Sequence, residues 1–403
     1  MGSEPQFSKY PDLSFSQDIF KVSNPHTPQD QIPAIRQRLK DAIEKSQMAP
    51  LYQQLCAPEK TAEGEHMTHT RPRANSKGLM GSGTHEAVTG IEWDEKLYKS
   101  MEAKNETELQ AMRKELDDSK EKAGEQEIQT AKGKIADFYA RIGDKEKAIA
   151  AFEDLMSENP ALGTRIDITL AIIRIALFFG DTRLVKKTID RAKTLVESGG
   201  DWDRRNRLKA YQGIYYLSVR DYNLSAPFLL DSLSTFTSYE LCSYSEIVIY
   251  AVIAGSVSLD RVDFKKRVVD APEIKAIVGS EDTRLAALSE DTEMTDAPST
   301  STAVNVATLG TNADEATESN VDFSPVVKLV TSFYNGNYAR FFVALAEIEE
   351  HFLTQDRFLC EHRAFFIREM RLRGYQQFLQ SYRIVGLDNM ASAFGVSVDY
   401  LDR

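Results

Sequence analysis

The chain has 403 residues, of which 42 % are apolar, so it is long enough for two or three domains with a sizeable core. It carries 61 acidic against 49 basic residues, a net charge of −12, which argues against general affinity for nucleic acid or anionic membranes. The three cysteines lie far apart without metal-site spacing, so we predict no disulfide framework. The longest apolar run, 247–259, is shorter than the roughly 20 residues that span a bilayer, and the N-terminus lacks a secretory signal. We expect a soluble intracellular protein with no membrane partner.

Residues 1–57 combine a tail with the first helices. Residues 1–30 are polar and contain several prolines, which predicts a mostly irregular tail. Helical spacing of apolar residues begins at Ile32 and continues through Leu39 and Ile43 to Leu55. Residues 58–91 break that spacing and are rich in Gly, Thr, His and Lys, so we predict a disordered insertion there.

Helical periodicity returns at the start of the segment 92–280. Trp93, Leu97 and Met101 lie four apart, which places them on one helix face. Asn105 followed by Glu108 resembles a capping box, which predicts a helix start at Asn105.

The stretch KIADFYARIGDKEKAIAAFEDLMSENP has the layout of a tetratricopeptide-type helix pair. Ala136 is the small residue where the two helices cross, and Tyr139 is the aromatic residue one turn later. Gly143 makes the turn, and Ala148 and Phe152 are the contacts of the second helix. Small residues are needed at crossings because side-chain volume sets how closely two helix axes approach.

The same helix-pair pattern recurs twice, with different residues at some of its positions. The turn reappears at Gly180, after an apolar helix, and again at Arg220, where Gly213 takes the small position and Tyr216 the aromatic one. The spacings from Gly143 to Gly180 and from Gly180 to Arg220 are 37 and 40 residues, within the range of helix-pair repeats. With a fourth pair expected over 240–268, the sequence predicts a helical solenoid.

Residues 281–323 differ from everything around them. No Lys or Arg occurs from 285 to 327, and the stretch is acidic and rich in Ser, Thr and Ala. Because such a stretch buries too little apolar surface to offset its ordering entropy, we predict a disordered acidic loop. Helices resume in the last segment, 324–403. Arg383–Gly386 is a short extended candidate, and MASAFGVSVDYLDR fits a helix-turn-helix.

Tetratricopeptide-like helices that run into a helix-turn-helix resemble the PCI-domain proteins, which are subunits of the proteasome lid, the signalosome and a translation initiation factor complex. Five segments carry the resemblance: FYARIGDKEKAIAAF (138–152), GGDWDRRNRLKAYQGIYYLSVRDY (199–222), STFTSYELCSY (234–244), LDRVDFKKRVVDAPEI (259–274) and the C-terminal part from FYNGNY to FGVSVDYLDR (333–403). It implies an all-α fold, a tetratricopeptide-like right-handed helical solenoid followed by a PCI-type winged helix that is truncated at the C-terminus.

The resemblance also implies a function. The ARIGDKEKA turn favours a non-catalytic scaffold subunit of the proteasome regulatory particle lid, which supports ubiquitin-dependent protein degradation. The alternatives are the paralogous signalosome subunit and a PCI subunit of the translation factor complex. Other PCI subunits of the lid are the implied partners, in a hetero-oligomer located in the cytoplasm and nucleus, with no cofactor.

The truncated winged helix leads to candidate interface residues. The family pattern continues with a β-wing and a terminal helix, so we expect the apolar side chains near the C-terminus to lose their cover and the chain to fray beyond Tyr382. The candidate protein-interface residues are Met390, Phe394, Val396, Tyr400 and Leu401.

Catalysis and nucleic-acid binding are the alternatives from other classes. His66 and His69 form an HxxH, but it lies in the predicted insertion without a third ligand, and no phosphate-binding glycine loop occurs. On the second helix of the helix-turn-helix, Asp399 and Asp402 would face phosphates, and residues 324–403 carry nine basic and nine acidic side chains. We therefore expect neither an enzyme nor a nucleic-acid-binding protein.

Overall fold

The computed structural model describes residues 10–56, 90–122, 124–275 and 322–402, and in these ranges every regular element is a helix. The all-α expectation is therefore confirmed for the described chain. The N-terminal and repeat helices are α1 Leu13–Ser23, α2 Ile32–Ser46, α3 Ala49–Cys56, α5 Glu95–Lys122, α6 Glu125–Ile142, α7 Lys145–Ser157, α8 Leu162–Phe179, α9 Thr182–Glu197, α10 Trp202–Ser218, α11 Tyr222–Ser232, η1 Leu233–Thr235, α12 Tyr244–Ser258, α13 Arg261–Phe264 and η2 Lys265–Val269. The C-terminal helices are α15 Ser324–Asn335, α16 Tyr338–Ile348, η5 Glu349–Leu353, η6 Cys360–His362, α17 Arg363–Leu379, α18 Leu387–Phe394 and α19 Val398–Leu401.

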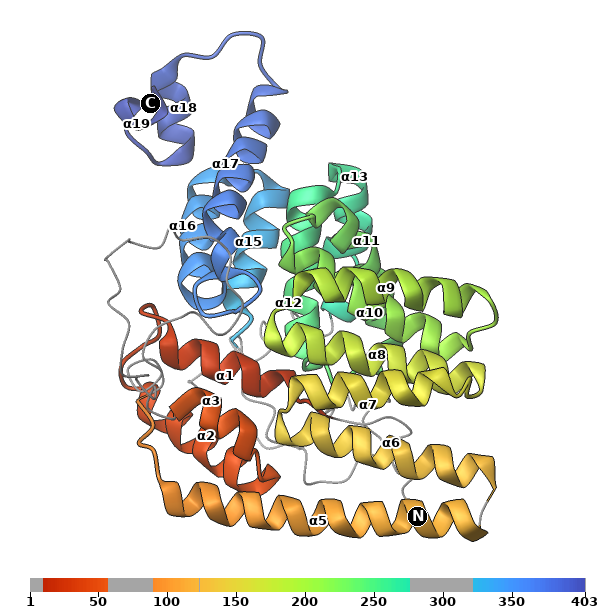
Figure 1. The fold of residues 1–403 in the computed structure, drawn as a ribbon. Coiled ribbons are helices and arrows are strands. Elements are labelled where there is room, and N and C mark those ends of the chain that lie inside the picture. The colour runs from red at the N-terminus through yellow and green to blue at the C-terminus, as the bar shows by residue number, and fades with distance from the viewer. Residues whose placement is uncertain (1–9, 57–89, 123, 276–321, 403) are drawn as a thin grey trace, which may run out of the picture.

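Antiparallel helix pairs stack on one another from α5 to α12, and α15–α17 stand beside α12 (Figure 1). In the middle of the stack, α8 and α12 are apolar around most of their circumference because neighbours cover them on several sides. None of the helices in the described ranges has the length and apolar character of a membrane span. The predicted insertion at 58–91 and acidic loop at 281–323 lie almost entirely outside the described residues.

One local device makes the turn inside each pair. A residue in the left-handed region ends the first helix of each pair, directly after the last helical residue at Gly143, Gly180 and Gly336 and one position later at Arg220, with φ from 66° to 79°. The next residue, Asp or Asn, then caps the following helix by accepting a hydrogen bond from the backbone N–H three positions on. Glycine suits the left-handed position because it has no Cβ to clash, so Arg220 is the exception among these turns.

The expectation of an irregular tail over residues 1–30 is wrong for the described part. Asp12 caps α1, and Leu13, Phe15 and Ile19 are buried in the main core. The Phe15 ring stacks on Phe178 of α8 at 6.3 Å between centroids. The helix is short and polar on one side, so its stability comes from this tertiary packing rather than from its own propensity.

The predicted helix start at Asn105 is also wrong. Helix α5 continues through this position from Glu95 to Lys122. The Asn105 amide instead donates a hydrogen bond over 2.8 Å to the backbone carbonyl of Gln47, at the end of α2. The Asn105 side chain therefore binds a carbonyl group that is distant in the sequence, and the spacing of residues along the chain does not predict such a contact.

Residues 383–386 form a bend instead of the expected extended segment, and Ile384 is 88 % exposed. A strand needs a partner for its backbone groups, and the described residues offer none. After this bend α18 and α19 form the predicted helix-turn-helix. Gly395 makes its turn at φ 66°, and Ser397 caps α19 by accepting from the Tyr400 N–H. Helix α18 packs on α16, a contact that opposes the expected fraying beyond Tyr382.

Candidate protein-interaction site

The residues predicted to pack the first helix pair lie together. Ala136 of α6 and Ala148 and Phe152 of α7 are buried in one apolar cluster, which α8 completes, and Tyr139 packs against it. Gly143 lies against α3, where an added Cβ would approach the Leu51 Cβ to 2.8 Å. The turn glycine therefore meets two requirements, a left-handed backbone and close approach to a neighbouring helix.

The third pair is packed by the same kind of residue. A Cβ on Gly213 of α10 would lie 2.5 Å from Leu229 Cδ2 of α11, so only glycine allows this approach. The Tyr216 ring stacks on Phe228 with centroids 5.8 Å apart. Both residues therefore belong to the contact between α10 and α11.

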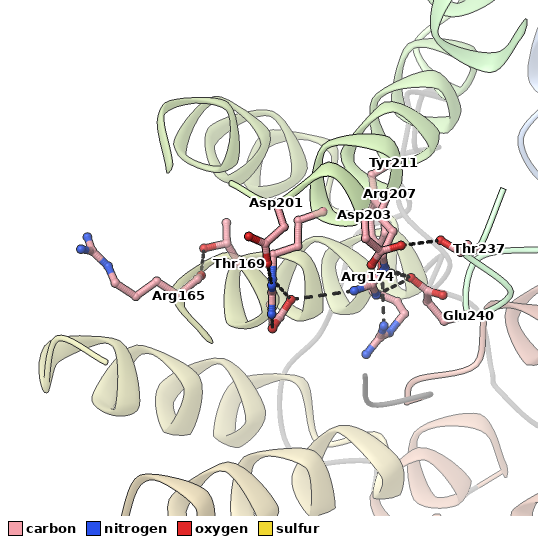
Figure 2. A network of polar contacts seen from close by, with 11 residues as sticks. Arg165, Thr169, Arg174, Asp201, Asp203, Arg207, Tyr211, Thr237 and Glu240 are labelled. Carbon is pink, nitrogen blue, oxygen red and sulfur yellow. Dashed lines mark hydrogen bonds and ion pairs between the residues drawn. The ribbon is translucent and has the colours of Figure 1, made fainter. Parts of the chain in front are cut away.

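A polar network that sequence analysis did not predict joins α8, α10 and the loop after η1 (Figure 2). Arg204 of α10 donates to the two carboxylate oxygens of Asp167 on α8, over 2.9 and 2.7 Å. Arg207, nearly a full turn further on, donates to Glu240 over 2.6 Å and has only 2 % of its side chain exposed. Since the loop residue Glu240 is tied to a buried arginine, the loop 236–241 is fixed against the repeat stack.

The network continues inward to the N-terminal segment. The Tyr211 hydroxyl donates to Glu240 over 3.1 Å and accepts from Arg174 of α8 over 3.3 Å. Arg174 also donates to the backbone carbonyl of Tyr10, over 3.0 and 2.5 Å. Burial, together with the charge of Glu240, raises the pKa of Tyr211 well above its ordinary value, so the hydroxyl keeps its proton and remains a donor.

At its outer edge the network supports two exposed aromatic side chains. Thr237 donates to Asp203 over 3.2 Å, and these two residues lie beside Tyr239 and Trp202 in sequence. Trp202 is 66 % exposed and Tyr239 is 60 % exposed. Tryptophan and tyrosine are enriched at the energetic centres of protein interfaces. The network therefore fixes the backbone that carries the exposed side chains of Trp202 and Tyr239.

The chemistry of this network is structural. The partly buried carboxylates of Asp167 and Glu240 are engaged by arginines and a tyrosine, an arrangement that fixes neighbouring elements. In the described ranges no group of three or more His, Cys, Asp or Glu side chains could hold a metal ion.

The structure differs from the expectation for one of the C-terminal interface candidates. Phe394 is 1 % exposed, so the expectation that it lacks cover is wrong. Its ring lies 4.7–5.6 Å from the rings of Tyr338, Phe342, Tyr375 and Phe378, which come from α16 and α17. This aromatic cluster holds α18 against the rest of the chain. The other candidates are more accessible: Met390, Val396 and Leu401 are half-buried, and Tyr400 is exposed.

An exposed apolar row near the C-terminus was missed by sequence analysis. It begins at the end of α17 and follows the bend to the start of α18, and it consists of Leu379, Tyr382, Ile384 and Leu387. Tyr382 and Phe378 also line a groove of about 520 Å³ beside Tyr338. The signal was present as apolar residues between 379 and 387, but sequence analysis treated Arg383–Gly386 only as a short extended candidate. We call these four residues the C-terminal apolar row.

Two family models match the chain. Residues 94–267, the repeat helices, match the family described as 26S proteasome subunit RPN7, and residues 339–403 match the PCI domain. The 26S proteasome regulatory subunit rpn7 of Schizosaccharomyces pombe is 35 % identical over 97 % of this chain and 82 % of its own length.

Two further relatives agree. The 26S proteasome non-ATPase regulatory subunit 6 of Dictyostelium discoideum is 35 % identical over 78 % of this chain and 72 % of its own length. The 26S proteasome regulatory subunit RPN7 of Saccharomyces cerevisiae is 30 % identical over 99 % of this chain and 82 % of its own length. By its repeat helices, its PCI domain and its 30–35 % identity to these relatives over most of the chain, the protein belongs to the RPN7 family of 26S proteasome subunits.

Proposed function

We propose that this protein is a non-catalytic scaffold subunit of the lid of the 26S proteasome regulatory particle, where it supports ubiquitin-dependent protein degradation. The observation that carries the proposal is the similarity to proteasome regulatory subunits over nearly the whole chain, across both the repeat helices and the PCI domain. Relatives named as non-ATPase subunits support a role in which chemistry belongs to neighbouring proteins.

The shape suits this role. Stacked helix pairs provide an extended surface in which each repeat adds contact area without needing catalytic groups. We propose other PCI subunits as partners, in a hetero-oligomer of the cytoplasm and nucleus that needs neither nucleic acid nor membrane. Among the described residues, the C-terminal apolar row is suited to such a contact, because exposed apolar side chains that lie close together mark interaction surfaces.

Affinity purification of the tagged protein from its native cell, followed by mass spectrometry, tests the proposal. We expect other PCI subunits together with proteasome peptidase activity. Recovery of signalosome subunits alone would assign the chain to the paralogous complex. Recovery of translation factors and ribosomes would favour the third member of the group, and recovery of none of these would reject a PCI scaffold altogether.

A further inference from the structure

The N-terminal segment 10–23 and the loop 236–241 are far apart in the sequence but lie at the two ends of one series of hydrogen bonds. The segment comprises Tyr10, the capping residue Asp12 and helix α1, and α1 packs against α8 of the repeat stack (Figure 1). We call it the N-terminal strap. The loop carries Tyr239, whose side chain is 60 % exposed.

One face of α8 holds the strap. Arg174 and Phe178 are four positions apart, so both side chains project from the same face of this helix. Phe178 stacks on Phe15 of the strap, and Arg174 donates from Nε and Nη2 to the carbonyl oxygen of Tyr10, over 3.0 and 2.5 Å. The docked strap therefore covers an apolar group of α8 and satisfies a charged one.

Arg174 depends on the strap because its charge is buried, with 2 % of the residue exposed. Two of its three described hydrogen bonds go to the Tyr10 carbonyl, and the third goes to the Tyr211 hydroxyl over 3.3 Å. A guanidinium has five N–H donors, and burial without partners is strongly unfavourable for a charged group. If the strap leaves, Arg174 keeps one of these three bonds, so the guanidinium has to move toward other acceptors.

The Tyr211 hydroxyl connects Arg174 to the loop. Because this hydroxyl accepts from Arg174, its proton is directed to the carboxylate of Glu240, 3.1 Å away (Figure 2). The same oxygen of Glu240 also accepts from Arg207 over 2.6 Å. Two residues of α10 thus hold the loop at Glu240, and one of them is aligned by Arg174.

We propose that the N-terminal strap regulates the loop 236–241, with Arg174 and Tyr211 as the positioning residues that couple them. With the strap docked, Tyr211 donates to Glu240 and the loop presents Tyr239 on a fixed backbone. With the strap undocked, that bond loses its alignment and the loop opens more often. Because coupling between two sites is reciprocal, a partner that binds the ordered loop also stabilises the docked strap. This coupling is a property of the folded chain and does not depend on which complex the chain joins.

Tyr211→Phe in the full-length protein cuts the coupling and keeps the buried ring. Hydrogen exchange, read by mass spectrometry, should then become faster in both 13–23 and 236–241, by roughly three- to tenfold, the effect of losing about one hydrogen bond. The increase at 13–23 is decisive, because the described hydrogen bonds of Tyr211 go to Arg174 and Glu240 and reach the strap through Arg174. An increase at 236–241 alone, or in neither segment, would overturn the proposal.

Tyr222→Phe on α11 is the matched control. Tyr222 is 3 % exposed, and its buried hydroxyl has no hydrogen-bond partner among the described residues. The change removes one buried hydroxyl, as Tyr211→Phe does, but it breaks no described hydrogen bond. Exchange at 13–23 and 236–241 should therefore stay at the wild-type rate. Equal increases in the two variants would assign the effect to general loosening of the core and reject the coupling.

Loosening the strap itself tests the coupling in the other direction. Phe15→Ala should speed exchange at 236–241 in the wild-type background and add little in the Tyr211→Phe background, where the connection is already cut. Phe341→Ala, at a fully buried ring of α16 outside the strap and the loop, controls for general loss of stability and should leave 236–241 unchanged. Additive effects of Phe15→Ala and Tyr211→Phe would mean that strap and loop are independent. If Phe15→Ala does not fold, as circular dichroism will show, exchange at 13–23 in Tyr211→Phe still decides.

Discussion

The side-chain amide of Gln17 in α1 donates a hydrogen bond to the carboxylate of Asp356 over 3.0 Å, joining residues 339 positions apart. The Asp356 carboxylate also accepts from the Tyr250 hydroxyl of α12 over 2.5 Å. In return, the backbone N–H of Arg357 donates to Gln17 over 2.9 Å. The N-terminal helix, the repeat stack and the turn before α17 therefore meet at one carboxylate.

Asp356 gives this junction a pH dependence. Burial raises its pKa to about 6, although hydrogen bonds from Tyr250 and two backbone N–H groups oppose the shift. The pKa of Asp356 is higher in the folded protein than in the unfolded chain, so protonation of this carboxylate favours folding. The free energy of unfolding therefore increases as the pH falls through about 6 toward 4, and this contribution is lost as the pH rises.

Asp356→Asn should therefore reduce the gain in unfolding free energy between pH 7 and pH 5 by on the order of 1 kcal/mol. Denaturant unfolding at the two pH values measures this difference. Asp30→Asn, at an exposed position in the described N-terminal segment, should keep the wild-type difference. A pH difference unchanged by Asp356→Asn would show that another group is responsible.

Phe15→Ala tests whether the N-terminal helix is an integral part of the core. Phe15 is 5 % exposed and stacks on Phe178 of α8. Removing a buried phenylalanine ring typically costs about 3–5 kcal/mol, and we expect a loss of that size in chemical unfolding. Lys40→Ala, at an exposed position of α2, should change the unfolding free energy by less than about 0.5 kcal/mol. Equal effects of the two changes would mean that α1 contributes little.

Arg220 combines a backbone cost with a contact that offsets it. It holds φ 66° where equivalent turns have glycine, and its guanidinium lies 4.8 Å from the centroid of the Phe365 ring on α17. In a Phe365→Leu background the contact is gone, so Arg220→Gly should stabilise the protein by roughly 0.5–1 kcal/mol through relief of strain.

In the wild-type background the same Arg220→Gly change should gain less, because it also removes a cation–π contact of about 0.5–1 kcal/mol. A double-mutant cycle on unfolding free energies gives this coupling. Zero coupling would mean that Arg220 and Phe365 do not stabilise each other.

Phe394→Ala should free α18 and α19 locally. The ring is enclosed by four aromatic side chains from α16 and α17, and the unit that it anchors is small. We expect faster hydrogen exchange at 387–401 by roughly 100-fold or more, which corresponds to about 3 kcal/mol, with exchange in α8 unchanged. Tyr400→Ala, at an exposed ring in the same unit, should have a much smaller effect. Unchanged exchange in Phe394→Ala would show that other contacts anchor α18.

The C-terminal apolar row provides the mutational test of assembly. Ile384→Glu places a charge on a side chain that is 88 % exposed, so the isolated protein should unfold as the wild type does. Its share in purified regulatory particle, measured by competition with co-expressed wild type, should fall at least tenfold if the row is an interface. Val262→Glu, on a side chain 78 % exposed at the start of α13, serves as the matched control and should incorporate normally. Normal incorporation of Ile384→Glu would remove the row from the interface.

Local chemistry in the sequence was sufficient to predict the repeat turns. A residue suited to the left-handed region, then Asp or Asn, defines a helix end and the next helix start within two positions, as at Gly143 and Gly180. The small residues Ala136 and Gly213 likewise mark helix crossings, because volume alone limits the approach of two axes. The turns and the small residues at crossings depend on residues that are close in the sequence, so the spacing of residue types along the chain predicts them.

Contacts between residues far apart in the sequence could not be predicted and became visible in the folded chain. Nothing near Gln17 indicates Asp356, and nothing near Asn105 indicates the carbonyl of Gln47. The α1 helix is ordered by burial against α8, and Phe394 is covered by rings from α16 and α17 rather than by a β-wing. A single sequence records the hydrogen-bonding capacity and apolar surface of each side chain. Which partner satisfies them depends on the packing of the whole chain, because solvation is lost only when distant elements come together.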